Sequence, residues 1–184
     1  MKKKTRRISG MFLCLVMVAM VFAVTVPMNM SADSQVPFKG NLDGSTVPSG
    51  NPYVERIEVS GQASHLGKYT AVVEAYMPGG QVIGVDPETG LYILLLPTTA
   101  TFTAANGDEL YADLVLVGGF DFTPTVMNFP SFTLTGTITG GTGRLAGASG
   151  TFTGSGGQIS VPGPDNDLIS GTFSGMISTV GSNK

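Results

Sequence analysis

The chain has 184 residues, of which ten are basic and thirteen are acidic. Five of the basic residues fall within the first seven positions, so the remainder sets five basic against thirteen acidic residues and carries a net charge of −8. A surface of that sign repels phosphate backbones, which disfavours nucleic acid as a partner.

Residues 1–32 have the pattern of an export signal. A basic start is followed by an apolar run over residues 8–26, the arrangement of a secretory signal helix. We expect cleavage near Ala32, with an uncleaved N-terminal anchor as the alternative. Residues 33–184 then form one domain of a secreted or extracytoplasmic protein, which meets a membrane only if the anchor is retained. Cys14, the only cysteine, lies in the apolar run, so the domain has no thiol chemistry.

Period-two alternation recurs after residue 33, whereas helical periodicity is almost absent. In residues 132–139, Phe132, Leu134 and Ile138 share one face and threonines occupy the other, as in a half-buried strand. Asn106-Gly107 joins two similar runs and predicts a hairpin with a type I′ turn. Strands are predicted at residues 36–42, 54–61, 68–77, 91–96, 98–104, 109–117, 132–139, 151–153, 158–161 and 168–179.

Glycine and proline clusters separate these runs, which predicts an all-β domain of about eight antiparallel strands. Closure into a single eight-stranded antiparallel β-barrel would remove the exposed edges that strands rich in threonine and valine otherwise offer for aggregation. A β-sandwich is the alternative, and the pattern does not separate the two.

Residues 140–150 form a glycine cluster between two predicted strands. No helix follows it, no Lys-Ser/Thr pair is present and no aspartate lies within it, so dinucleotide, P-loop and calcium-roll sites are disfavoured. The cluster resembles the hairpin of the dirigent and allene oxide cyclase barrels, Gly-Gly-Thr-Gly-Arg/Lys-Phe-x-x-Ala-x-Gly. The matching residues are Gly140, Gly141, Thr142, Gly143, Arg144, Ala148 and Gly150, and Leu145 stands where the family has Phe.

A shorter element, Ser64-His65-Leu66-Gly67-Lys68, resembles one in uncharacterised exported bacterial proteins of the same barrel type. The resemblance implies an eight-stranded barrel. It also implies a homo-oligomer, because dirigent and cyclase relatives often form trimers. Fold alone does not imply function.

Five residues are candidates for chemistry. His65, the only histidine, could act as a general base, although a histidine beside a glycine at a strand start more often binds a nearby carbonyl. Glu74 and Tyr76 share one strand face, as do Tyr111 and Asp113 on another. Facing a lumen, these four could perform acid–base chemistry. We expect instead that the Leu/Ala faces form the interior and that the carboxylates are solvated.

The function predicted on these grounds is the binding of a small apolar ligand in the barrel lumen, with no cofactor and no metal. A cofactor-free isomerase or cyclase of the allene oxide cyclase or dirigent type is one alternative. A structural or adhesive surface protein, which needs no cavity, is another. An enzyme is the less expected outcome.

Overall fold

The computed structural model describes residues 34–120, 130–159 and 167–178, which belong to one compact unit spanning residues 32–184. The predicted signal helix and its cleavage site lie outside the described residues. The strands are β1 (Val36–Val47), β2 (Val54–Ala63), β3 (Gly67–Tyr76), β4 (Gln81–Val85), β5 (Tyr92–Ala104), β6 (Glu109–Phe120), β7 (Phe132–Gly141), β8 (Ser149–Ile159) and β9 (Leu168–Ser178). Two 3-10 turns, η1 (Met77–Gly79) and η2 (Gly143–Leu145), complete the elements.

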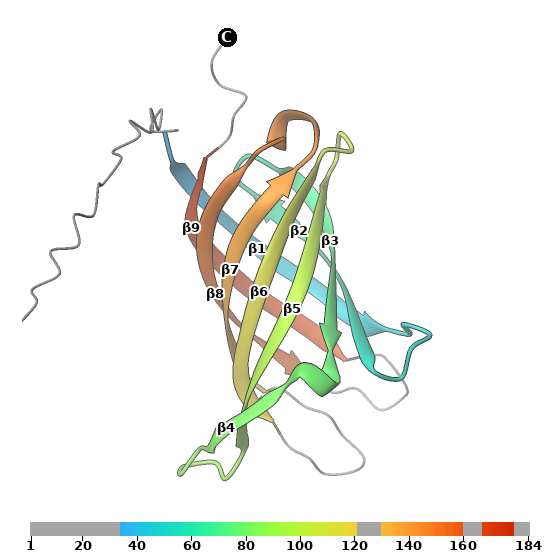
Figure 1. Cartoon of the computed structure of the whole chain (residues 1–184), viewed down its shortest axis with the longest axis vertical. Coiled ribbons are helices and arrows are strands. Elements are labelled where there is room, and N and C mark those ends of the chain that lie inside the picture. The colour runs from blue at the N-terminus through green and yellow to red at the C-terminus, as the bar shows by residue number, and fades with distance from the viewer. Residues whose placement is uncertain (1–33, 121–129, 160–166, 179–184) are drawn as a thin grey trace, which may run out of the picture. The chain divides into compact units, whose positions relative to one another are not determined.

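Eight of these strands close into an antiparallel barrel (Figure 1). The sheet order is β3-β2-β1-β9-β8-β7-β6-β5-β4, and β3 also pairs with β5, so that the ring is complete. The predicted eight-stranded β-barrel is confirmed, and the sandwich alternative is wrong.

The inner and outer faces follow the alternation expected from the sequence. In β7, Leu134 and Ile138 are buried and Phe132 is half-buried, whereas the threonines between them are exposed. In β6, Leu110, Ala112 and Leu114 are likewise buried. Closure turns the apolar face of each of the eight barrel strands toward the lumen because only that face can lose its contact with water favourably.

Strand β5 is one continuous element where the sequence predicts two. Pro97 interrupts the predicted runs, yet it lies inside β5 and pairs with Val115 of β6. On the other side of β5, β4 pairs only as far as Leu95 and β3 begins at Thr98. The missing N–H of Pro97 therefore falls where β5 changes partner, a position at which no ladder bond is lost.

Strand β4 is an addition that the sequence pattern does not predict. It pairs only with the first residues of β5 and lies outside the ring of eight. Its side chains alternate too little for a period-two signal, because Val82, Ile83 and Val85 are all exposed. Figure 1 shows β4 next to the start of β5, beyond the point where β3 ends.

Phenylalanine rings fill the middle of the lumen. Phe38, Phe152 and Phe173 contact one another with ring centroids 5.1 to 5.6 Å apart, and Phe102 packs against the same group. The strands make room for these rings with glycine: a Cβ at Gly136 would stand 2.3 Å from Cζ of Phe152. A small barrel holds large side chains only where the facing positions are small.

The β5–β6 hairpin has a different turn from the one predicted. Gly107 has φ +86°, but Asn106 is not among the residues of positive φ, so the turn is not type I′. The Gly107 N–H donates to the Ala104 carbonyl (2.9 Å), and the Ala104 N–H donates to the Asp108 carbonyl (2.8 Å). A type I turn followed by a left-handed glycine fits this pattern. With one extra loop residue, only Gly107 has to adopt a positive φ.

Candidate ligand-binding cavity

The residues of the glycine cluster close one end of the barrel. We call this the closed end; the β2–β3, β5–β6 and β7–β8 turns lie there. Leu145, at the end of η2, is 2% exposed and belongs to the main core cluster. Gly143 (φ +54°) and Gly147 (φ +73°) provide the left-handed backbone that folds the loop inward. Leu145 is therefore a core residue although it lies in a loop.

Arg144 fastens this loop to the neighbouring hairpin. Its Nε donates to Asp108 Oδ2 at 2.9 Å, and its backbone N–H approaches the same oxygen at 3.3 Å. The Glu109 N–H donates to Thr142 Oγ1 at 2.8 Å. The guanidinium group of Arg144 lowers the pKa of Asp108, followed by the hydrogen bond from Asn106. The glycine cluster thus connects the β7–β8 hairpin to the β5–β6 hairpin.

His65 lies in the β2–β3 turn at the closed end. It adopts φ +70°, the only non-glycine residue with positive φ in the described part of the chain. Its Nε2 lies 3.1 Å from the Pro37 carbonyl, which Ser64 Oγ also donates to at 3.0 Å. The expected contact of His65 with a nearby carbonyl is confirmed, and the turn is attached to β1 by it.

Glu74, Tyr76, Tyr111 and Asp113 all lie on the outer face of the barrel. Glu74 and Tyr76 are exposed, and a carboxylate oxygen of Glu74 lies 3.6 Å from Arg56 Nη1. Asp113 is exposed, and Tyr111 donates a 2.6 Å hydrogen bond to Glu109 Oε2, which raises its pKa. The expectation that the carboxylates are solvated is confirmed, and none of the four faces the lumen.

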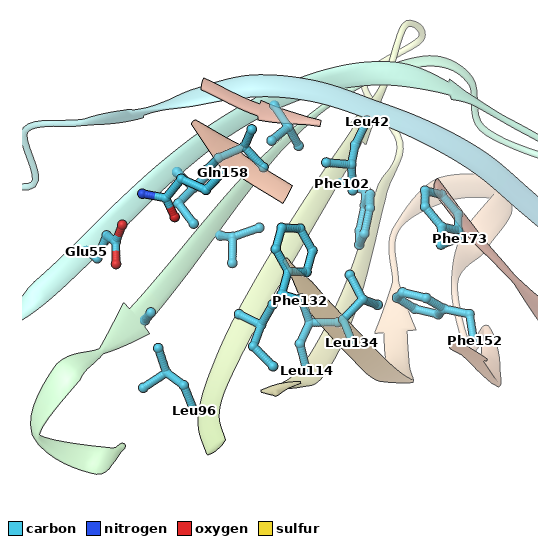
Figure 2. Close-up of a pocket in the computed structure, with 16 residues that line it drawn as sticks. Leu42, Glu55, Leu96, Phe102, Leu114, Phe132, Leu134, Phe152, Gln158 and Phe173 are labelled. Carbon is cyan, nitrogen blue, oxygen red and sulfur yellow. The ribbon is translucent and has the colours of Figure 1, made fainter. Parts of the chain in front are cut away.

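A cavity of about 70 Å³ lies in the lumen toward the opposite end, which we call the cavity end. All eight barrel strands contribute to its wall, and every lining residue except Glu55 and Gln158 is apolar. Figure 2 shows the carboxylate of Glu55 and the amide of Gln158 on one side of the cavity and the rings of Phe152 and Phe173 on the other. The cavity therefore has an apolar floor and a polar side.

Polar side chains face inward at this end because strand alternation continues past the apolar core. Glu55 shares its face with Ile57 and Val59 of β2, and Gln158 shares its face with Phe152 of β8. Alternation within residues 54–61 places Glu55 on the apolar face, so the sequence contained the signal for it. Neither residue is among the five candidates predicted from the sequence, four of which lie on polar strand faces.

Gln158 is held in position by a chain of hydrogen bonds. The side chain is 5% exposed, and its Nε2 donates to Asp167 Oδ2 at 2.5 Å. The Asp167 N–H in turn donates to Thr46 Oγ1, and the Thr46 N–H donates to the Asp167 carbonyl, both at 3.0 Å. Thr46 is itself buried and faces inward from β1. These bonds connect the end of β1 to the start of β9 and orient the Gln158 amide.

Tyr69, near the start of β3, is a buried core residue that carries a polar group. Its hydroxyl donates to the Asn41 carbonyl at 2.8 Å, which satisfies the group. Burial raises the pKa of this hydroxyl, and the negative charge of Asp43 raises it further. Tyr69 therefore remains neutral over the physiological range, as a packed core residue does.

Within the described residues, no helix is long and apolar enough to cross a membrane. No group of three or more His, Cys, Asp or Glu side chains in the same residues is arranged to hold a metal ion. No protein-family profile matches the chain. A search of curated proteins also finds no match.

Proposed function

We propose that the chain binds a small apolar molecule in the barrel lumen. The observation that carries the proposal is the cavity, because an eight-stranded barrel can either fill its interior with side chains or hold one small ligand. Here the closed end is filled and the cavity end retains about 70 Å³ of free space with an almost wholly apolar wall. Apolar cavities of this kind favour apolar guests over water.

The size of the cavity limits the ligand. An engineered cavity of about 150 Å³ accepts benzene, and drug-sized ligands occupy about 300–1,000 Å³. A space of about 70 Å³ therefore accommodates a few heavy atoms as it stands. Longer ligands would have to displace side chains of the wall. We accordingly propose a small ligand.

A matched pair of variants on one strand tests the proposal. Val73 lines the cavity, whereas Val72, its neighbour in β3, faces outward. We expect xenon to give a concentration-dependent ¹²⁹Xe chemical shift with the wild type and with Val72→Phe, and no such shift with Val73→Phe, whose ring occupies the space. Native mass spectrometry of protein purified from its source should show a retained small molecule with the same dependence.

Two outcomes would contradict this function. One is a xenon shift that survives unchanged in Val73→Phe when circular dichroism shows that the variant is folded. The other is the absence of any response of the wild type to xenon, benzene or n-hexane.

We further propose that the protein is exported and that it is a dirigent- or cyclase-type barrel. Export is supported by the basic and apolar pattern of residues 1–32. The family is supported by the glycine cluster, whose glycines and Leu145 form the inward-folded loop of the closed end. N-terminal sequencing of the secreted protein, with Asp33 as the expected first residue, tests the export.

A further inference from the structure

An open groove lies on the outer face of the barrel near the closed end, over the first three strands. It has a volume of about 700 Å³ and is lined by residues of β1, β2, the β2–β3 turn and the start of β3. Three of these residues, Ser64, Gly67 and Lys68, belong to the short sequence element of the β2–β3 turn, and none of them lines the cavity in the lumen. The groove is therefore a feature separate from the cavity.

Two lysines line this groove from either side of β2. Lys39 belongs to β1 and Lys68 to β3. Within the described residues neither lysine forms an ion pair, whereas Arg56 and Arg144 both pair with carboxylates. After the first seven positions the chain has thirteen acidic and five basic residues, so carboxylates are plentiful, and yet none lines the groove. The two ammonium groups are therefore available to an anion from outside the chain.

Neutral polar side chains lie between the two lysines. Asn41 pairs with Gln62 across β1 and β2, and Gln62 pairs with Lys68 across β2 and β3, so the three side chains form one row on the outer face. The Asn41 amide is oriented within the fold, because its Oδ1 accepts a 3.2 Å hydrogen bond from the Gln62 N–H. The Gln62 side chain is exposed and forms no hydrogen bond with the rest of the described chain. Its amide can therefore both donate to and accept from a ligand.

The row continues into a second hollow on the neighbouring strands. Asn41 pairs with Thr172 of β9, and Thr172 pairs with Ser155 of β8. A hollow of about 270 Å³ lies here, and the hydroxyl side chains that line it are Thr153, Ser155, Thr172 and Ser174. From Lys68 to Ser155 the row crosses four strand spacings, about 19 Å. The surface is thus cationic at one end and lined by hydroxyl groups at the other.

We propose that this row binds an acidic oligosaccharide, whose carboxylate groups bind the two lysines and whose hydroxyl groups bind the neutral side chains. A sugar hydroxyl both donates and accepts hydrogen bonds, as do the amide of Gln62 and the hydroxyls of Thr172 and Ser155. A row about 19 Å long fits a short chain of sugar rings, whereas a single ion would use only the groove. The inference goes beyond the proposed function, because the row lies on the outer face and the cavity lies in the lumen.

The negative charge of the domain acts weakly at the groove. At physiological ionic strength, interactions between exposed charges are screened beyond about 8 Å. Asp43 is the carboxylate that follows Asn41 on the outer face of β1, and it lines neither hollow. The local charge of the groove is therefore positive. Two lysines are nevertheless too few to hold a nucleic-acid duplex, which agrees with the sequence-based expectation.

The test compares three probes at pH 7 and low salt. Trigalacturonate is acidic and hydroxylated, maltotriose is hydroxylated but neutral, and triglutamate is acidic without sugar hydroxyls. Their dissociation constants are measured by NMR titration of the backbone amides of the exported protein. We expect trigalacturonate to bind at least about 5-fold more tightly than either of the others, because only it uses both the lysines and the hydroxyl side chains.

Two pairs of variants locate the binding surface, and circular dichroism checks that each is folded. Lys68→Gln should weaken trigalacturonate binding by about 3- to 5-fold, the effect of one exposed ion pair. Arg56→Gln removes the same charge from β2 outside both hollows and should change the affinity by less than about 1.5-fold. Thr172→Val keeps the shape of the side chain and should weaken trigalacturonate by about 3-fold. Thr137→Val, on the exposed face of β7 outside both hollows, is its control and should have no effect.

Three outcomes would overturn this inference. If triglutamate binds as tightly as trigalacturonate, or if Thr172→Val has no effect, the groove accepts any anion and the assignment of an oligosaccharide is wrong. If Arg56→Gln weakens trigalacturonate as much as Lys68→Gln does, the attraction is a general charge effect and the assignment to the groove is wrong. If trigalacturonate does not bind, the whole inference fails. None of these results changes the response of the lumen to xenon, which tests the proposed function separately.

Discussion

Replacement of Leu145 by alanine should destabilise the barrel strongly, although the residue lies in a loop. Leu145 is 2% exposed and packs in the main core cluster at the closed end. Its N–H donates to the Thr142 carbonyl at 2.9 Å, and the Ala148 N–H donates to its carbonyl at 2.9 Å. The ion pair of Arg144 with Asp108 holds the same loop. The loop therefore has little freedom to collapse into the space that alanine leaves.

The expected cost follows from that rigidity. Buried Leu→Ala substitutions cost about 2–5 kcal/mol, more where the surroundings cannot relax, so we expect about 3–4 kcal/mol for Leu145→Ala. At a urea m-value of about 2 kcal/mol/M, this lowers the unfolding midpoint by about 1.5–2 M. Far-UV circular dichroism is the suitable signal, because the chain has no tryptophan.

Leu168→Ala is the matched control for this measurement. Leu168 starts β9 at the cavity end and is exposed, so its loss should change the free energy of unfolding by less than about 0.5 kcal/mol. A cost below about 1 kcal/mol for Leu145→Ala would refute the reasoning, because it would mean that the glycine loop does not seal the core.

Two further substitutions test the packing and the electrostatics of the barrel. Gly136→Ala should cost about 1–3 kcal/mol in urea unfolding, because the new Cβ would meet the Phe152 ring at 2.3 Å while that ring is enclosed by other phenylalanines. Gly84→Ala in β4, where the nearest atom would be 3.7 Å away, is its control, and equal costs for the two would contradict this account. For Asp108, contact with Arg144 lowers the folded-state pKa below the ordinary value of 3.8. Its stabilising contribution is therefore fully present above that value and is lost as the pH falls through the lower folded pKa. The stability difference between wild type and Asp108→Asn should narrow as the pH is lowered from 7 to about 2.5, and a constant difference would show that this carboxylate does not contribute.

The strand pattern of this chain is readable from local sequence because each strand has one face in the lumen and one in water. Phe132, Leu134 and Ile138 of β7 reveal their face by period two alone. Local sequence predicts a strand wrongly where its pairing with a strand distant in the sequence decides which residues are tolerated. Pro97 reads as a break, yet it lies within β5, because a change of neighbour from β4 to β3 removes the need for its N–H.

The sequence predicted the candidate site less well than it predicted the fold. Two candidates predicted from the sequence are the carboxylates of Glu74 and Asp113. Both lie on polar strand faces and are therefore exposed. Glu55 was not predicted as a candidate, because the other residues on its strand face are apolar. Those apolar neighbours are the reason that Glu55 points into the lumen. In a barrel, an isolated polar residue on an apolar strand face is a better indicator of a cavity residue than a carboxylate on a polar face.

The sequence by itself determined the all-β class and the inner and outer faces of strands such as β6 and β7, because alternation acts over a few residues. Only the tertiary structure decided that β3 pairs with β5 to close the ring, since that pairing joins segments about thirty residues apart with another strand between them. Closure also decided which end is filled and which retains a cavity, and it brought Glu55 and Gln158 into the wall of one cavity. Those juxtapositions depend on register around the whole barrel, which no local pattern specifies.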